Sequence, residues 1–142
     1  MFDANVYFDD RYNRYLKYIT NYYISSVVVQ ECLVGCEYIR ISEKIAIYDK
    51  EYYTERVIVP DYNDWKAVGK CMSFLNSNKH IRLGGITKPE LSMLVKDALI
   101  ASSAGRNKAL VITENIRDFQ LICDNYFKST KYQSAASYFD TR

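Results

Sequence analysis

Short, apolar, β-branched runs alternate with longer amphipathic stretches along this chain. The runs VIVP (57–60) and ALVIT (109–113) have the length and composition of buried strands. Apolar residues recur at helical spacing in residues 63–76 and 90–105. Strands that alternate with helices predict βαβ units and a parallel sheet, so the sequence favours an α/β fold. In such sheets the reactive groups gather beyond the carboxyl ends of the strands.

The other segments extend this alternation. We expect strands at 2–8 and 22–24, with a helical segment within 9–20. Capping residues predict further helix starts at Ser25 or Ser26, at Ser42, at Asp61 or Asn63, and at Thr87 with Pro89 and Glu90. The helix that starts at Ser25 or Ser26 is expected to end near residue 39, and a last helix is expected over 115–126.

Length and charge set broad limits. The 142 residues are enough to bury a core, and we expect a single domain over 1–142, in which 127–142 either pack or form a loosely ordered tail. The formal net charge of +2 is too mild to indicate nucleic-acid binding by itself. No signal-peptide pattern opens the sequence, and no apolar run reaches the length of a membrane span. We therefore expect a cytoplasmic protein.

The cysteines do not point to a metal site. The chain has four cysteines, none in a C-x-x-C pair, and one histidine. A zinc site is therefore poorly supported. Small, buried thiols in a reducing compartment are the simpler interpretation.

A carboxylate in the middle of an apolar helical face is the feature that most suggests chemistry. Asp97 lies within the helix expected over 90–105. Its neighbours three and four residues away are Met93, Leu94, Ile100 and Ala101, all apolar. A carboxylate in such surroundings costs several kcal/mol unless it is paired or binds a cation.

Three further acids come from other elements. Glu31 has only apolar residues and glycine as helical neighbours, Asp3 lies in the first expected strand, and Asp118 closely follows the strand at 109–113. Simpler interpretations stay open for each: a solvent-facing glutamate, a strand-end turn residue, and part of a capping box in the first turn of a helix. Asp64, near another helix start, is interpreted as an ordinary N-terminal charge.

Asp3, Glu31, Asp97 and Asp118 together have the chemistry of a divalent-cation site. Mg²⁺ and Mn²⁺ prefer oxygen ligands and need few carboxylates beside water and a substrate phosphate. Two such ions about 4 Å apart would activate a water and stabilise the leaving oxygen of a phosphodiester. Without a cation, clustered carboxylates would raise one another's pKa.

Five segments, in order along the chain, resemble the PIN-domain ribonucleases and, more narrowly, the VapC-type toxins of bacterial toxin–antitoxin pairs. They are FDANVYFD (2–9), SSVVVQECLVG (25–35), IVPDYNDW (58–65), LVKDALIASSA (94–104) and VITENIRDF (111–119). The resemblance implies a three-layer α/β/α fold with a central parallel sheet, dependence on Mg²⁺ or Mn²⁺, and RNA as substrate. It also implies a homodimer, and an antitoxin partner whose C-terminal segment lies across the active-site groove.

Position by position, the resemblance assigns the catalytic, metal-binding acids to Asp3, Glu31, Asp97 and Asp118, and supporting polar positions to Asn5, Thr113 and Asn115. Asp3, Asp97 and either Glu31 or Asp118 would bind the principal ion. The remaining acid would hold a second ion or orient its water, so one ion or two stay open. Thr113 would fix the orientation of a carboxylate or a water.

Basic residues near this site are candidates for contacts to RNA phosphates, with solvated surface charge as the alternative. Lys96 and Arg117 are the foremost candidates, and the others are Arg82, Lys88 and Arg106. Lys96 is also a departure, since the family often has asparagine directly before the third acid. Tyr12, Tyr15 and Tyr18 fit base stacking, antitoxin contact or internal packing equally.

Two other functions stay open. One is a PIN-domain nuclease that processes RNA without an antitoxin, and the other is a catalytically silent PIN module that binds proteins. The presence of all four acids disfavours the silent module. A neighbouring gene for a small DNA-binding protein would favour the toxin.

Overall fold

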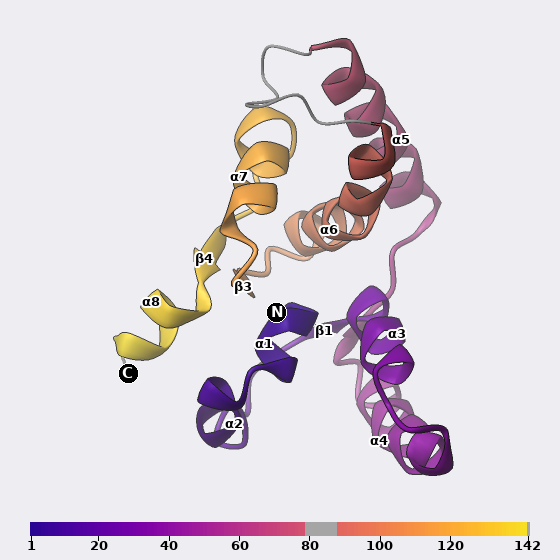
Figure 1. Cartoon of the computed structure of the whole chain (residues 1–142), viewed down its shortest axis with the longest axis vertical. Coiled ribbons are helices and arrows are strands. Elements are labelled where there is room, and N and C mark those ends of the chain that lie inside the picture. Colours follow the sequence, from indigo (N-terminus) through magenta and orange to yellow (C-terminus); the bar gives the residue numbers. More distant parts are fainter. Residues whose placement is uncertain (79–87, 142) are drawn as a thin grey trace.

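A computed structural model describes residues 1–78 and 88–141 (Figure 1). Its helical segments are α1 (Ala4–Phe8), α2 (Asp10–Leu16), α3 (Ser26–Val34), the 3₁₀ turn η1 (Tyr38–Arg40), α4 (Ile41–Tyr53), α5 (Tyr62–Ser77), α6 (Lys88–Arg106), α7 (Ile116–Asn125) and α8 (Ala135–Asp140). Its strands are β1 (Ile24–Ser25), β2 (Val57–Ile58), β3 (Val111–Thr113) and β4 (Tyr132–Ser134). Thr87, the expected cap of α6, lies outside the described residues.

The strands of the described segments pair two by two, in parallel. Ile24 of β1 lies opposite Val57 of β2, and Val111 of β3 lies opposite Tyr132 of β4. Phe2 adds an isolated parallel bridge to β3. The mixed α/β class and the parallel pairing are therefore confirmed. Within residues 1–78 and 88–141, however, these two- and three-residue strands do not join into the expected central sheet of a three-layer fold.

The first strand is shorter than predicted because a helix replaces most of it. Asp3 is the N-cap of α1, and its carboxylate accepts a hydrogen bond from the backbone N–H of Ala4 at 2.7 Å. A capping aspartate satisfies a free N–H at a helix start, which favours the helix over an extended strand. The expected strand over 2–8 is therefore wrong beyond the bridge at Phe2.

Two capping predictions are confirmed, and two boundaries differ. Ser25 caps α3, and Asp61 caps α5 with a full capping box. α3 ends at Val34 rather than near residue 39, because the chain leaves the helix at the following glycine. The prediction that Ser42 caps a helix is wrong, since α4 already begins at Ile41.

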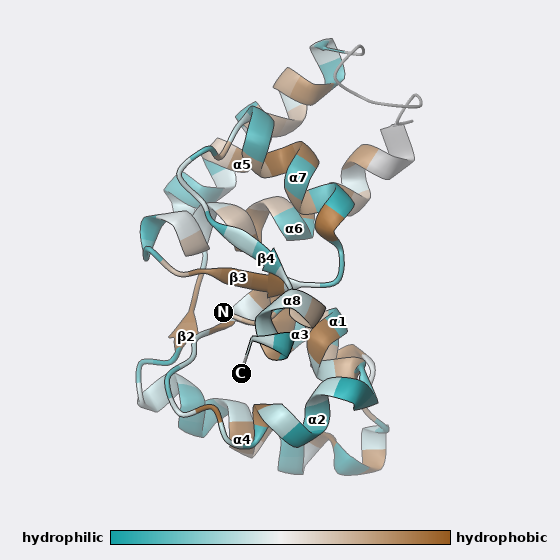
Figure 2. Cartoon of the chain, turned by 90° about the vertical axis from the view of Figure 1, so that its left-hand side faces the viewer, coloured by the Kyte–Doolittle hydropathy of each residue, from teal (hydrophilic) through white to brown (hydrophobic). Residues whose placement is uncertain are grey.

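Helix α6 is central to the larger core. It packs against α5, α7, α3 and β3. In Figure 1, α5, α6 and α7 occupy one half of the molecule and α1 to α4 the other, with β3 between the two halves. Figure 2 shows β3 as an apolar strand through the middle. The fully or almost fully buried residues of α6 include Leu94, Ala98, Leu99, Ile100 and Ala101. This packing fixes the helix that carries Asp97.

A second core joins the two ends of the chain. Tyr12 and Tyr15 of α2 stack on Phe139 of α8, with ring centroids 5.0 and 5.1 Å apart, and Phe2 stacks on the same ring at 6.0 Å. Internal packing therefore accounts for two of the three tyrosines, whereas Tyr18 is 76% exposed. The C-terminal residues form β4 and α8 and contribute to this core.

Gly105, near the end of α6, meets the turn before β4 at very close range. The Thr130 hydroxyl donates a hydrogen bond to the carbonyl of Ala101 at 2.8 Å. A β-carbon on Gly105 would clash with that same hydroxyl oxygen. Only glycine fits this contact without a shift of the backbone.

The four cysteines are free thiols. Cys71 and Cys123 are buried, and Cys32 and Cys36 are half-buried. In the part of the chain that the structure describes, no helix has both the length and the apolar character needed to cross a membrane.

Candidate functional site

The end of β3 holds the carboxylate of Asp3. The hydroxyl of Thr113, which is fully buried, donates to Asp3 Oδ2 at 2.8 Å, and Asn5 Nδ2 donates to the same oxygen at 2.9 Å. The backbone N–H of Asn115 donates in turn to Thr113 Oγ1 at 2.9 Å. Because the Thr113 hydroxyl is held on both sides, the orientation of Asp3 is fixed.

The side chain of Asn115 connects two further acids. Its Nδ2 donates to Asp97 Oδ2 and to Asp118 Oδ2, each at 2.8 Å. One amide group therefore links the middle of α6 to the first turn of α7. Although Asn115 is the N-cap of α7, it makes no side-chain capping bond, so the capping-box interpretation of Asp118 is wrong.

Glu31 approaches this group from α3. Its Oε1 lies 3.1 Å from Lys96 Nζ, which forms an ion pair between α3 and α6. The negative charge of Glu31 also acts on Asp3 and Asp97. Of the two foremost candidates for phosphate contact, Lys96 is therefore engaged with an acid of the site, while Arg117 is exposed on α7.

The pKa values report how close these charges are. Burial and the charges of Asp3, Asp118 and Glu31 raise the pKa of Asp97 to about 8, against the opposing hydrogen bond from Asn115. Burial also raises the pKa of Asp3, and the charge of Glu31 adds to that effect. The hydrogen bonds that Asp3 receives work in the opposite direction. The predicted acids are thus brought within electrostatic range of one another.

This donor set fits a hard divalent cation by its chemistry. It combines four carboxylates from separate elements with the amide of Asn115, and oxygen is the ligand that Mg²⁺ and Mn²⁺ prefer. The raised pKa of Asp97 indicates negative charge that its neighbours do not compensate. Among the described residues, no three Asp, Glu, His or Cys side chains already converge as a ready-made cage. Binding would therefore draw the carboxylates closer together.

The apolar neighbours of Asp97 do not all face the core. Leu94, Ile100 and Ala101 are buried, but Met93 is 75% exposed. The three buried residues anchor α6, and the carboxylate lies at the edge of that contact, where Asn115 reaches it. The apolar character of the neighbours therefore reflects core packing at three positions but not at Met93.

Asp64 is more than the ordinary helix-start charge that the sequence indicates. It is 3% exposed and accepts hydrogen bonds from Ser102 Oγ at 2.8 Å and from Arg106 at 2.7 Å. Burial would raise the pKa of Asp64, but these donors and the backbone N–H of Asp61 hold it below its ordinary value. No local sequence signal identifies this contact, because Asp64 lies 42 positions before Arg106, on another helix.

The remaining basic candidates have other placements. Arg106 is bound to Asp64 and so is a structural residue. Arg82 lies outside the described residues, as does the side chain of Lys88. Glu114 accepts hydrogen bonds from Tyr12 Oη at 2.5 Å and from a backbone N–H of α8. No pattern in the sequence indicated these contacts. Glu114 therefore links α2 to α8.

Two solved structures have a similar fold. A chain of VapBC2 from Rickettsia felis, bound to a DNA fragment from its promoter, matches with a TM-score of 0.57 and 21% identity. A chain of VapBC-1 from nontypeable Haemophilus influenzae matches with a TM-score of 0.56 and 22% identity. Both alignments cover 94% of this chain and 96% of the other. The chain has the fold of a VapC-type PIN domain.

At this level of identity the likeness concerns the fold. No protein-family model and no curated protein matches the sequence.

Proposed function

We propose that this chain is a divalent-metal-dependent endoribonuclease and the toxin of a VapBC-type pair. The observation that supports the proposal best is the group of Asp3, Glu31, Asp97 and Asp118, in which Asp97 feels the charges of the other three. Neutral amide and hydroxyl groups orient Asp3, Asp97 and Asp118 without compensating their charge. A divalent cation is the partner that such an oxygen-rich group lacks.

Each side chain has a role in this proposal. Asp3, Asp97 and Asp118 supply carboxylate oxygens to the ion, Thr113 orients Asp3, and Asn115 keeps the other two carboxylates together. Bound Mg²⁺ or Mn²⁺ would supply a water of lowered pKa and offset the negative charge that develops on the phosphodiester.

RNA is the proposed substrate, as the resemblance implies. Arg117 follows the end of β3 closely and is exposed on the first turn of α7, next to Asp118. A guanidinium at that position can bind a backbone phosphate in two-point geometry. We therefore assign Arg117 to RNA binding rather than to catalysis.

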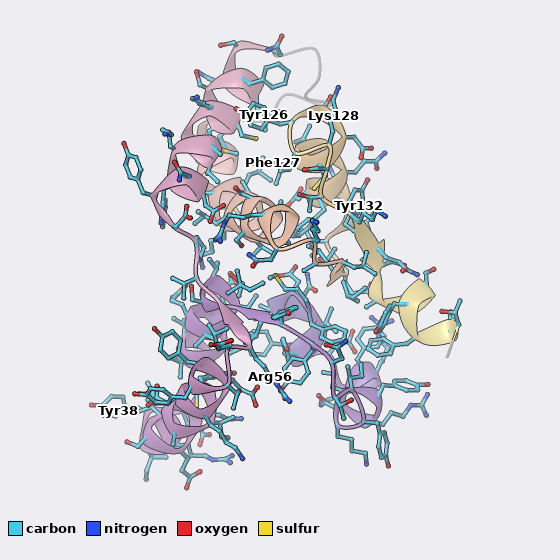
Figure 3. The ribbon with its side chains drawn as sticks, turned by 180° about the vertical axis from the view of Figure 1, so that it is seen from behind. Tyr38, Arg56, Tyr126, Phe127, Lys128 and Tyr132 are labelled. Atoms are coloured by element: carbon cyan, nitrogen blue, oxygen red, sulfur yellow. The ribbon has the colours of Figure 1, made fainter. Side chains whose placement is uncertain are left out.

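An antitoxin is the proposed partner, and exposed apolar residues on the arm formed by α3, η1 and α4 support it. Val34, Tyr38 and Ile39 at the tip of this arm are 75%, 87% and 89% exposed. Figure 3 shows Tyr38 at the outer end of the arm, pointing away from the other helices. Helix α4 itself has no fully buried residue, although it carries several large apolar side chains. Exposed apolar surface of this kind favours a protein partner.

The decisive test is an RNA cleavage assay on the full chain, with single-stranded and looped RNA in Mg²⁺. We expect cleavage that EDTA abolishes and that Asp97→Asn reduces by at least about a hundredfold. Asp49→Asn, which changes an exposed aspartate on α4, is the matched control and should cleave normally. Metal-independent cleavage, or equal cleavage by Asp97→Asn, would contradict the proposed chemistry.

Expression in cells tests the toxin assignment separately. We expect growth arrest that the Asp97→Asn variant does not cause and that a co-expressed antitoxin relieves. Cleavage in vitro without growth arrest would instead indicate RNA processing, and a folded chain that never cleaves RNA would indicate a protein-binding module. Light scattering on the purified chain tests the homodimer that the resemblance implies.

A further inference from the structure

Lys96 places a positive charge at the exposed edge of the acidic group, with 49% of its side chain exposed. Its Nζ lies 3.1 Å from Glu31 Oε1 and donates a hydrogen bond to it. The two residues are 65 positions apart and come from different helices, so the fold, not local sequence, makes the pair. In the described part of the chain, Glu31 is the one acid of the four that forms an ion pair.

The other three acids are held differently. Asp3 receives hydrogen bonds from Thr113, from Asn5 and from a backbone N–H, and all of these donors are neutral. Asp97 and Asp118 share the neutral amide of Asn115. Neutral donors orient a carboxylate but leave its charge in place, whereas an ammonium compensates that charge. Among the described residues, the acidic group therefore contains three carboxylates with neutral donors and one carboxylate, Glu31, with a cationic donor.

This division limits how cations can bind. An ion held by Asp3, Asp97 and Asp118 meets three carboxylates that form no ion pair with the basic residues of 1–78 and 91–141. A second ion that used Glu31 would have to displace the Lys96 ammonium and would be repelled by it at short range. Because Lys96 and Asp97 are adjacent on α6, their side chains leave the helix about 100° apart. Lys96 can therefore remain on Glu31 while Asp97 serves the ion.

We propose that Lys96 is a positioning residue that occupies Glu31 and thereby limits this site to a single divalent ion. The inference rests on the proposed metal-dependent function and names the number of ions at that same site. Glu31 then serves as the anchor of Lys96 rather than as a ligand of the resident ion. Asparagine at this position, being neutral, would leave Glu31 free for a second ion.

The test is Mn²⁺ binding to the full chain by titration calorimetry, with no RNA present. We expect one Mn²⁺ per wild-type chain, and the same for Lys96→Arg, which keeps the charge. Lys96→Met and Lys96→Asn should bind two Mn²⁺ per chain, because Glu31 is then free to hold the second ion. Glu31→Gln should still bind one ion with nearly unchanged affinity. Lys70→Met, which removes an exposed lysine of α5, is the charge-matched control and should behave as wild type.

Circular dichroism on every variant establishes that the helices are retained. Two ions on the wild-type chain, or a single ion per chain in both Lys96→Met and Lys96→Asn, would overturn the role of Lys96. If Asp97→Asn still abolishes binding in that case, the metal site of the proposed function stands. Absence of Mn²⁺ binding by the wild-type chain would overturn both proposals.

Discussion

Helix α6 contacts one buried aspartate, Asp64, and carries one half-buried aspartate, Asp97, and the fold treats their charges in opposite ways. Asp64, on α5, accepts hydrogen bonds from Arg106 and Ser102, and its pKa lies below the ordinary value. Asp97, on α6 itself, has Asn115 as a neutral donor and three acids in electrostatic range, and its pKa rises to about 8. Burial opposes ionisation at both positions. The difference is that Arg106 supplies a positive charge to Asp64, whereas no basic side chain of the described residues forms an ion pair with Asp97.

The largest effect should follow from removing the compensated aspartate. Asp64→Ala would leave Arg106 without its partner, remove the bond from Ser102 and open the capping box of α5. We expect a loss of about 3 kcal/mol in the free energy of unfolding, somewhat reduced because Arg106 is half exposed to solvent. Urea denaturation measures it, with Asp49→Ala as the control. A loss below about 1 kcal/mol would mean that solvent already screens this pair.

The uncompensated aspartate should show the opposite sign. Its raised pKa means that the folded, metal-free chain favours neutral Asp97. The stability from this preference is present at low pH and is lost as the pH rises through about 8. Asp97→Asn should therefore stabilise the metal-free chain by roughly 2 kcal/mol at pH 8, because some relaxation around the charge reduces the full effect.

Below about pH 4 the Asp97→Asn variant and the wild-type chain should be nearly equal in stability, since Asp97 is protonated in both folded and unfolded chains. Denaturation in EDTA at several pH values measures this trend. If the free energy of unfolding depends on pH in the same way in both proteins, the pKa of Asp97 is not raised in the folded chain.

A divalent ion should distinguish the two aspartates directly. At Mg²⁺ ten times above its dissociation constant, ligand linkage gives about 1.4 kcal/mol of stabilisation, or a rise in Tm of about 4 °C. We expect this rise in the wild-type chain and in Asp64→Asn, measured from each protein's own Tm. Asp97→Asn should lose it. A rise that depends on Asp64 instead would reverse the comparison.

The smallest effect concerns the orientation of Asp3. Thr113→Val removes the hydroxyl that donates to Asp3 and accepts from the N–H of Asn115, at a cost of about 1 kcal/mol in stability. Mn²⁺ affinity should fall by about tenfold, since the carboxylate loses its orientation. Thr113→Ser keeps the hydroxyl and should retain the affinity. Unchanged binding by Thr113→Val would mean that Asn5 alone orients Asp3.

The sequence was most informative where a residue contradicted its local surroundings. Asp97 stands out because its helical neighbours are apolar, and Glu31 stands out for the same reason. Asp3 and Asp118 were noticed from their places near expected strands, and the resemblance then assigned all four acids to a metal site. The charges of Asp3 and Asp118 both act on Asp97. Nothing observed so far tests their catalytic role, which stays a prediction.

What the sequence could not supply are contacts between distant residues. The pairs Glu31–Lys96 and Asp64–Arg106 join positions 65 and 42 residues apart, and no local pattern specifies either one. The first strand was overestimated for a local reason: FDANVYF resembles a strand, but the capping bond of Asp3 favours a helix. The expected single sheet failed because the paired segments are only two or three residues long.

The contact between Gly105 and Thr130 has a consequence for reading mutational scans of this chain. Any larger residue at 105 would push the turn before β4 away from the helix that carries Asp97. Under the proposed toxin function, substitutions at Gly105 and at Asp97 would both relieve toxicity in a growth-based screen, and the two positions would look equally essential. Protein abundance separates them, because a displaced turn lowers the amount of folded chain while a missing carboxylate does not. Sensitivity to substitution alone would therefore count a packing glycine as part of the active site.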